Sequence, residues 1–251
     1  MGTNYSPKIV TENIVLYFDA ANPKSYPGSG TSITDISRNN NNGTLTSGVT
    51  YESENKGSIR LNASTHRIEF PEVNLSPPWT TQMTYKNLNS TANTNANMTL
   101  FGHTSANNPG WHRIRTQLVE GNSRVRLQIW YQNPSGGWSS LSQYMGPHGS
   151  SYVDPALQDE FWINRIITIT ITVSENNIYR FYMNGELIQT RNRSSSGDQN
   201  NGLTVNRLGV YGSTSYPLNG NIYSAIIYNK ELTEEEVMQN YQAIKNRFND
   251  S

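Results

Sequence analysis

The sequence predicts an all-β fold, an antiparallel jelly-roll sandwich, with one α-helix packed on it near the C-terminus. Apolar and polar residues alternate with a period of two over many short segments, and turns containing Gly, Asn and Pro separate these segments. A single segment at the end has helical periodicity instead. The 251 residues suit one large all-β domain. We therefore expect an N-terminal arm over residues 1–12 and one domain over residues 13–251.

The clearest strands are residues 113–119 and 124–131, along which apolar and polar residues alternate. The intervening Glu-Gly-Asn-Ser suits a four-residue hairpin loop. Antiparallel pairing through that loop predicts the cross-strand pairs Leu118–Val125, Ile114–Ile129, Gln117–Arg126, Arg115–Gln128 and Arg113–Trp130. The last pair brings a guanidinium over an indole ring, which is the geometry of a cation–π contact.

A second ribbon is predicted over residues 166–173, 178–183 and 186–190. Its second turn is Asn184-Gly185, the dipeptide that best tolerates the positive φ angles of a type I′ hairpin. Further strands are predicted at residues 13–18, 57–61, 66–70, 98–103, 203–210 and 221–228.

One helix is predicted over residues 232–248. Thr233 and Glu236 have the spacing of a capping box, and Leu232 and Val237 have the spacing of a hydrophobic staple. Glutamates occupy the first turn and basic residues the last, as the helix dipole favours. The apolar stripe expected to contact the sandwich consists of Val237, Tyr241, Ile244 and Phe248.

Charge and composition exclude several classes of partner. Nineteen Lys and Arg balance nineteen Asp and Glu, so the chain lacks the positive excess that nucleic-acid binding needs. There is no cysteine, which excludes disulfides, thiolate catalysis and Cys-ligated zinc. The most apolar run, residues 162–173, is short and interrupted by threonines, so no membrane contact is expected. The first residues also lack the pattern of a secretion signal.

The sequence contains no motif that predicts catalysis, and we expect no enzymatic activity and no catalytic residue. The histidines lack metal-ligand spacing and no Gly-x-Ser-x-Gly motif occurs. We therefore interpret the four histidines as surface or loop residues: His66, His103, His112 and His148.

Large aromatic residues gather in the middle of the chain, in segments with many Gly, Pro and Ser residues that we expect near strand ends and loops. They are Trp111, Trp130, Tyr131, Trp138 and Tyr144. Exposed aromatic rings beside amide groups can stack on sugars, and the same rings can also cover the ends of a sandwich or a subunit interface. Both interpretations stay open, and an interface or core position is the favoured one.

The polar face of the predicted hairpin carries four arginines: Arg113, Arg115, Arg124 and Arg126. Such a face is usually only solvated. Concentrated on one ribbon of a neutral protein, it can also meet an acidic patch on a neighbouring subunit.

Several segments resemble the laminin-G-like, concanavalin A-type jelly-roll family. The opening "NIVLYFDAANPKSYPGSG" and "TDISRNNNNGTL" is similar to the first strands and loop of that family, although Arg38 occupies a position that is usually Gly. The hairpin "YRFYMNGELIQT" resembles the family's Tyr-x-Asn-Gly-x-Leu signature, and "GNIYSAIIYNKELTEEEVMQNYQAIKNRF" resembles its closing strand and helix.

The resemblance raises two questions about chemistry. Related glucanases carry a Glu-x-Asp-x-x-Glu motif that is absent here, and the nearest acidic pair, Glu69 and Glu72, is interrupted by Pro71 and expected at a strand end. Many relatives also bind calcium at a loop rim, for which Asp19, Asp35 and Asn39 are the candidate ligands. We favour the alternative that these three residues cap loops through Asx turns.

The N-terminal segment and the terminal helix are also similar to modules of tailed-phage structural proteins. That resemblance implies a non-enzymatic virion protein, of the capsid decoration or fibre type, that acts through interfaces with capsid or tail proteins and with its own copies, for instance as a trimer. Its expected location is the virion, an extracellular particle made in the host cytoplasm. The alternative is a lectin-like adhesin that binds host surface polysaccharide through the aromatic segments.

Overall fold

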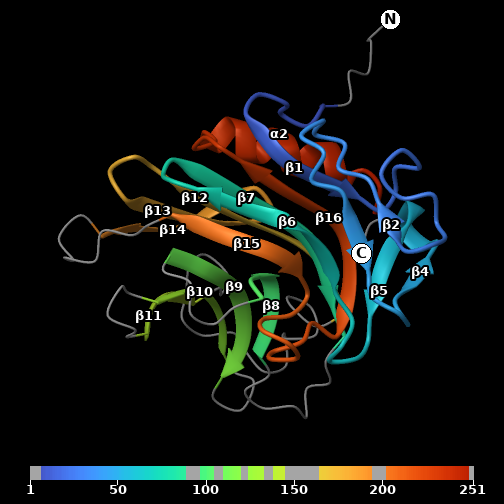
Figure 1. Ribbon diagram of the computed structural model, residues 1–251. Helices are drawn as coiled ribbons and strands as arrows, with labels where there is room; N and C mark the ends of the chain where they lie inside the picture. The colour runs from blue at the N-terminus through green and yellow to red at the C-terminus, as the bar shows by residue number, and fades with distance from the viewer. Residues whose placement is uncertain are drawn as a thin grey trace, which may run out of the picture.

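The computed structural model describes residues 7–88, 97–104, 110–119, 124–132, 138–144, 164–193 and 202–248. Over these residues the chain forms two eight-stranded sheets and the helix α2 (Glu234–Lys245). The two sheets face each other, and α2 lies on the outer side of one of them (Figure 1). No helix in the described ranges is both long and apolar enough to span a membrane.

The first sheet is the one that α2 covers. Its strands, in spatial order, are β14 (Glu186–Asn192), β13 (Ile178–Met183), β12 (Ile166–Val173), β7 (Trp79–Asn87), β16 (Gly220–Tyr228), β5 (Ser58–Leu61) and β4 (Thr50–Glu52). The strand β1 (Ile14–Asp19) pairs with the C-terminal half of β16, beyond the part that pairs with β5.

The second sheet forms the opposite layer. Its strands, in spatial order, are β11 (Trp138–Tyr144), β10 (Arg124–Gln132), β9 (Gly110–Val119), β8 (Asn97–Gly102), β15 (Leu203–Leu208), β6 (Ile68–Leu75), β3 (Gly43–Leu45) and β2 (Ser32–Ile33). The pairing is antiparallel along this order, and one additional parallel contact joins β15 to β9. The antiparallel sandwich predicted from the alternating pattern is thus confirmed.

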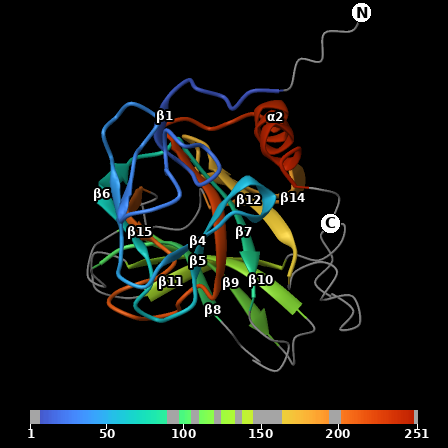
Figure 2. The same cartoon turned by 90° about the vertical axis from the view of Figure 1, so that its right-hand side faces the viewer.

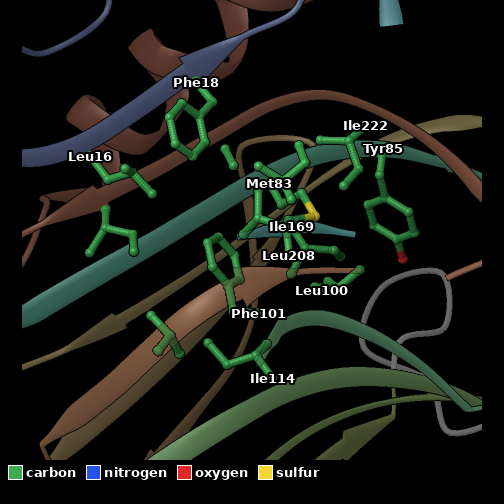
Figure 3. Packing of buried hydrophobic residues seen from close by; sticks show 14 of the residues in the cluster. Leu16, Phe18, Met83, Tyr85, Leu100, Phe101, Ile114, Ile169, Leu208 and Ile222 are labelled. Carbon is green, nitrogen blue, oxygen red and sulfur yellow. The ribbon is translucent and has the colours of Figure 1, made fainter. Parts of the chain in front are cut away.

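The hydrophobic core lies between the two sheets (Figure 3). Its side chains point toward one another from opposite layers, as a sandwich requires. The labelled residues come from β1, β7, β12 and β16 on one side and from β8, β9 and β15 on the other: Leu16, Phe18, Met83, Tyr85, Ile169 and Ile222, facing Leu100, Phe101, Ile114 and Leu208.

Most predicted strands are present within a few residues of their expected bounds, and two of them, 166–173 and 178–183, match β12 and β13 at both ends. The Asn184-Gly185 turn has φ angles of 52° and 85°, which confirms the predicted need for positive φ. The sequence interpretation missed β7, although this strand lies in the middle of the first sheet and is almost entirely buried.

The strand β7 was missed because its outward residues are polar. Thr84 pairs with Thr168 across the sheet at 2.8 Å between hydroxyl oxygens. The hydroxyl of Thr80 donates to the carbonyl of Lys230 (2.8 Å) and accepts from the amide of Leu232 (3.0 Å). These hydrogen bonds allow a polar face to be buried beneath the segment that leads into α2.

The prediction that the acidic pair lies at a strand end is wrong, because β6 continues through Pro71 to Leu75. The register between β6 and β15 shifts here, so that Glu69 pairs with Arg207 while Val73 pairs with Val205. Residues 70–72 therefore form a bulge, in which the missing N–H of proline breaks no ladder hydrogen bond.

The helix α2 begins with the predicted capping box. The hydroxyl of Thr233 accepts from the amide of Glu236 (3.3 Å), whose carboxylate accepts from the amide of Thr233 (3.0 Å). Leu232, Val237 and Ile244 are buried against the outer face of β13 and β16. Figure 2 shows that the helix lies on this face, on the side of the sandwich opposite β9 and β10.

The described part of the predicted arm lies against this helix. The amide of Val10 donates to the side chain of Asn240 (2.8 Å), and the phenol of Tyr228 donates to the carbonyl of Val10 (3.0 Å). The amide of Asn240 in turn donates to the Tyr228 oxygen (2.9 Å). Residues 7–12 are thus tied to α2 and β16, while residues 1–6 lie outside the described ranges.

Candidate functional site

The outer face of β9 and β10 carries the candidate site. The predicted register of this hairpin is confirmed at every pair, including Arg115 opposite Gln128 and Arg113 opposite Trp130. Ile114 and Ile129 point into the core, so the alternating arginines point to the other side of the sheet.

Two of these arginines lie among aromatic rings. The guanidinium carbon of Arg113 is 4.9 Å from the Trp130 ring centroid, and that of Arg115 is 4.8 Å from it. Two tyrosines from the segment after β15 contribute further rings: Tyr211 lies 4.4 Å from Arg113, and Tyr216 lies 4.8 Å from both arginines. Distances in this range are those of cation–π contacts. We name these five residues the arginine–aromatic cluster.

The segment 209–218 is held in place by backbone hydrogen bonds. The amide of Gly212 donates to the carbonyl of His103 (3.0 Å), and the amide of Thr99 donates to the carbonyl of Tyr216 (2.8 Å). The guanidinium of Arg207 also donates to the Gly212 carbonyl. Tyr216 is fixed by these contacts at a φ of 53°, a left-handed conformation that is strained for a residue with a large side chain.

Burial and like charge both disfavour the charged form of the arginines in the cluster. Arg113 and Arg115 are 5% and 6% exposed, whereas Tyr216 is 38% exposed. Burial lowers the pKa of both guanidiniums, and the neighbouring charge of Arg113 lowers the pKa of Arg115 further. The cluster thus holds two positive charges close together in a desolvated place.

Hydrogen bonds extend from Arg115 along the sheet. Its Nε donates to the Gln128 side-chain oxygen (2.8 Å), and the Gln128 amide donates to the hydroxyl of Ser142 on β11 (3.0 Å). At the cross-strand pair two residues along the hairpin, the guanidinium of Arg126 donates to the side-chain oxygen of Gln117. A row of amides and hydroxyls therefore runs beside the aromatic rings.

The structure places the sequence-predicted aromatic residues on the strands β9–β11, at or near the ends of these strands. The antiparallel pairing of these strands places Trp111 opposite Tyr131, Trp138 opposite Gln132, and Tyr144 opposite Arg126. Of the predicted aromatic set, only Trp130 has a side chain within the described part of the structure. The side chain of Arg124 also lies outside it, while its backbone pairs with Val119.

Sequence reasoning missed Tyr211 and Tyr216, which lie about 80 to 100 residues from the hairpin in the chain. A signal was present, because the segment Val-Tyr-Gly-Ser-Thr-Ser-Tyr-Pro (210–217) has the same mixture of aromatic and small residues that singled out the other segments. Nothing in that pattern specified which sheet the tyrosines would contact.

The loop 35–45 is ordered by Asp35. Its carboxylate accepts hydrogen bonds from the amides of Tyr17 (2.9 Å), Ser37 (2.9 Å) and Asn41 (3.1 Å), and from the hydroxyl of Ser37 (2.8 Å). Arg38, at the position that is usually Gly in the family, has a φ of 76°. The Asx-turn capping that we favoured for Asp35 is therefore present.

The other two candidate calcium ligands have separate partners. Asp19 is 1% exposed, and its oxygens accept from Arg247 at 2.5 and 2.6 Å, from the phenol of Tyr17 and from the amide of Ala21. Asn39 donates its side-chain amide to the carbonyl of Ile14 (2.7 Å). In the described ranges no group of three or more His, Asp or Glu residues is placed to hold a metal ion.

The carboxylates of the acidic pair Glu69 and Glu72 contact basic side chains. Glu69 lies 2.7 Å from Arg67 and 3.3 Å from Arg207, and Glu72 lies 2.8 Å from the ring of His103. Two carboxylates that flank a scissile glycosidic bond must face a common substrate position. Each of these carboxylates instead contacts its own basic side chain.

Comparison with known proteins identifies the family. The family described as the concanavalin A-like lectin/glucanases superfamily matches residues 62–238, which is more than half of the chain, so the chain belongs to that superfamily. Among curated proteins no match is found.

Solved structures with the same fold include receptor-binding parts of toxins. The botulinum neurotoxin serotype D binding domain is 17% identical with a TM-score of 0.65, and its ligand-binding domain in complex with N-acetylneuraminic acid is 16% identical, also at 0.65. The binding domain of Paraclostridial Mosquitocidal Protein 1 is 20% identical at 0.61. These matches cover 93%, 93% and 92% of this chain and 52%, 51% and 52% of the others, so this chain spans about half their length.

Proposed function

We propose that this member of the concanavalin A-like lectin/glucanases superfamily is a non-enzymatic binding module of a tailed-phage virion, and that it binds host surface polysaccharide through the arginine–aromatic cluster. The observation that carries the proposal is the cluster itself, in which Trp130 and Tyr216 lie beside guanidiniums and the amide of Gln128. Aromatic rings with a few polar groups beside them are the chemistry of a ligand site.

The absence of a catalytic motif supports a function in binding. The sequence contains no Glu-x-Asp-x-x-Glu motif, and Glu69 and Glu72 contact arginine and histidine side chains. Glycosidase activity would need two carboxylates that are both free to act on the same glycosidic bond.

Two further observations support carbohydrate as the ligand and a virion as the location. One neighbour of the same fold was solved in complex with N-acetylneuraminic acid, which makes sugars the first ligand class to test. The virion location rests on the sequence resemblance of the opening segment and the terminal helix to modules of tailed-phage structural proteins. Fold alone does not specify function, so both points need a direct test.

The test is binding of the full chain to a panel of immobilised bacterial surface polysaccharides. We expect Trp130→Ala to lose binding, because the central ring of the cluster is removed, while Leu187→Ala keeps it. Leu187 is a suitable control because it is 41% exposed on β14 of the other sheet. The melting temperature of each variant shows whether it still folds. Tyr216→Ala is a second test variant, which removes the exposed ring of the cluster. Binding to no polysaccharide, or equal binding by all variants, would overturn the proposal.

A second candidate function is capsid decoration or a fibre component that acts through protein interfaces. The observation that favours it is the position of β11, which pairs only with β10 in the described ranges and so forms an edge of the second sheet beside the cluster. An unpaired edge next to positive charge suits a neighbouring subunit, including another copy in a trimer.

Locating the chain on the assembled particle separates the two candidates. An array of copies over the whole shell favours decoration and counts against an adhesin. Copies restricted to a tail tip favour the adhesin and count against decoration.

A further inference from the structure

In the cluster and beside it, buried hydrogen-bond donors lack acceptors in the described ranges. Among the described residues, the buried indole Nε1 of Trp130 and the Nε of Arg126 have no hydrogen-bond partner. A guanidinium and an indole N–H donate and cannot accept. A buried donor without an acceptor costs free energy, so the missing component of this site is a group that accepts.

Arg115 shows the same imbalance in charge. No carboxylate of the described residues lies within ion-pair distance of its guanidinium, and the acceptors it uses are the neutral groups of Gln128 and Tyr216. Five arginines elsewhere in the described structure have carboxylate partners: Arg60 with Glu52, Arg67 and Arg207 with Glu69, Arg180 with Glu231, and Arg247 with Asp19. A nearly buried charge is normally paired, whereas this one has no carboxylate partner among the residues that the structure describes.

The geometry limits where a ligand acceptor can bind. The rings of Trp130 and Tyr216 both lie 4.8 Å from the guanidinium carbon of Arg115, in the range of contacts with its faces. Gln128 occupies the Nε donor. Tyr216 accepts from one terminal N–H group, and the other terminal N–H groups of the planar guanidinium can donate to the two oxygens of a carboxylate.

Tyr216 supplies a surface for the rest of such a ligand. Its ring is the most exposed part of the cluster, and its strained backbone is held by the hydrogen bond from Thr99. Strain of this kind is typical of sites that hold a side chain ready for a ligand. A sugar ring stacked there would lie directly beside the donor groups.

We propose that the cluster binds a sugar residue that carries a carboxylate, with the carboxylate on the terminal N–H groups of Arg115 and the sugar ring against Tyr216. This inference rests on the proposed carbohydrate-binding function and narrows it to acidic polysaccharides. An acidic protein segment offers carboxylates too, but the exposed aromatic ring and the row of neutral amides favour a sugar.

The experiment compares two probes that differ only in charge: oligogalacturonate and its carboxyl-reduced form, measured by calorimetry with the full chain. We expect at least tenfold tighter binding of the acidic probe, weakening as NaCl is raised. Arg115→Gln should lose at least tenfold for the acidic probe and little for the reduced probe. The matched control Arg67→Gln, which alters an arginine paired with Glu69, should bind as the unaltered chain does.

Each other outcome overturns a defined part of the proposal. Equal binding of both probes, or unchanged binding by Arg115→Gln, refutes the acidic-sugar inference and leaves the polysaccharide function standing. Tighter binding of poly-glutamate than of oligogalacturonate assigns the cluster to a protein partner. Binding to neither probe nor to any polysaccharide of the panel removes the proposed function as well. If Arg115→Gln fails to fold, the difference in affinity between the two probes on the unaltered chain still tests the carboxylate contact, and Tyr216→Ala should weaken the binding of both probes.

Discussion

The two outer faces of the sandwich differ in what covers them and in whether their arginines have carboxylate partners. On the first sheet, α2 and the N-terminal segment cover the strands, and buried groups such as Tyr228, Asn240 and Thr84 have hydrogen-bond partners within the chain. On the second sheet, guanidiniums lie among aromatic rings, and donors of Trp130 and Arg126 lack acceptors in the described ranges. The chain itself covers the first face, whereas the second face, in our proposal, binds a partner.

Arginine makes this contrast clearest. Arg247, after α2, holds the buried carboxylate of Asp19 with two short hydrogen bonds. Arg115 is buried to a similar or greater degree and has only neutral partners among the described residues. The same side chain therefore stabilises the fold on one face and, in our proposal, binds a ligand on the other.

The largest expected effect comes from breaking the ion pair on the helix face. Arg247→Gln should lower the free energy of unfolding by about 3 kcal/mol, because it leaves the carboxylate of Asp19 buried and unpaired. Urea denaturation measures this. The control Arg67→Gln alters a more exposed pair and should cost less than about 1 kcal/mol. An equal loss of unfolding free energy in the two variants would mean that burial does not make the Arg247–Asp19 pair more stabilising than the Arg67–Glu69 pair.

Helix packing should contribute slightly less. Ile244→Ala removes a fully buried side chain between α2 and the first sheet, and we expect a loss of about 2–3 kcal/mol. Leu187→Ala, at an exposed position on β14, should change stability by no more than about 0.5 kcal/mol. A loss of less than about 1 kcal/mol for Ile244→Ala would show that α2 is not needed to close this face.

The helix cap should have a smaller effect. Thr233→Ala removes the acceptor for the amide of Glu236 and should cost about 1 kcal/mol in thermal denaturation. Ser53 provides the matched control, because it occupies the N-cap position of the short 3-10 helix Glu54–Lys56 without a side-chain cap hydrogen bond. Ser53→Ala should leave the melting temperature unchanged, and a similar shift for both variants would argue against the capping box.

The smallest expected effect on stability is at the candidate site. Arg115→Gln removes a buried charge that has no carboxylate partner in the described ranges, so the free energy of unfolding should stay within about 1 kcal/mol of the unaltered value or rise. The same urea titration measures it. A loss as large as that of Arg247→Gln would mean that Arg115 is a structural residue, and the contrast between the two faces would fail.

Local patterns predicted much of the fold. The hairpin of β9 and β10 has the predicted register at each pair because a four-residue loop and an alternating pattern leave one pairing that keeps Ile114 and Ile129 on the core side. The strand β7 escaped prediction because its threonines and glutamine read as a solvated face. Their burial depends on partners such as Thr168 and the segment before α2, which lie far away in the chain.

The candidate site was predicted in part for the same reason. Arg113, Arg115 and Trp130 are neighbours through one local register, so their contact followed from the hairpin. Tyr211 and Tyr216 reach the cluster only because β15 lies next to β8 and β9 in the folded sheet. No local pattern encodes that neighbourhood.

The sequence by itself determined what depends on residues close together in the chain: the alternating strands, the Asn184-Gly185 turn, the capping box of α2 and the hairpin that carries the arginines. The tertiary structure decided which face each polar strand would bury, that Asp19 would pair with Arg247, and that Tyr216 would lie over Arg115. The physical reason is range. Turn preferences, helix capping and side-chain alternation depend on residues a few positions apart, whereas the order of strands in a sheet follows from burying the whole core at once.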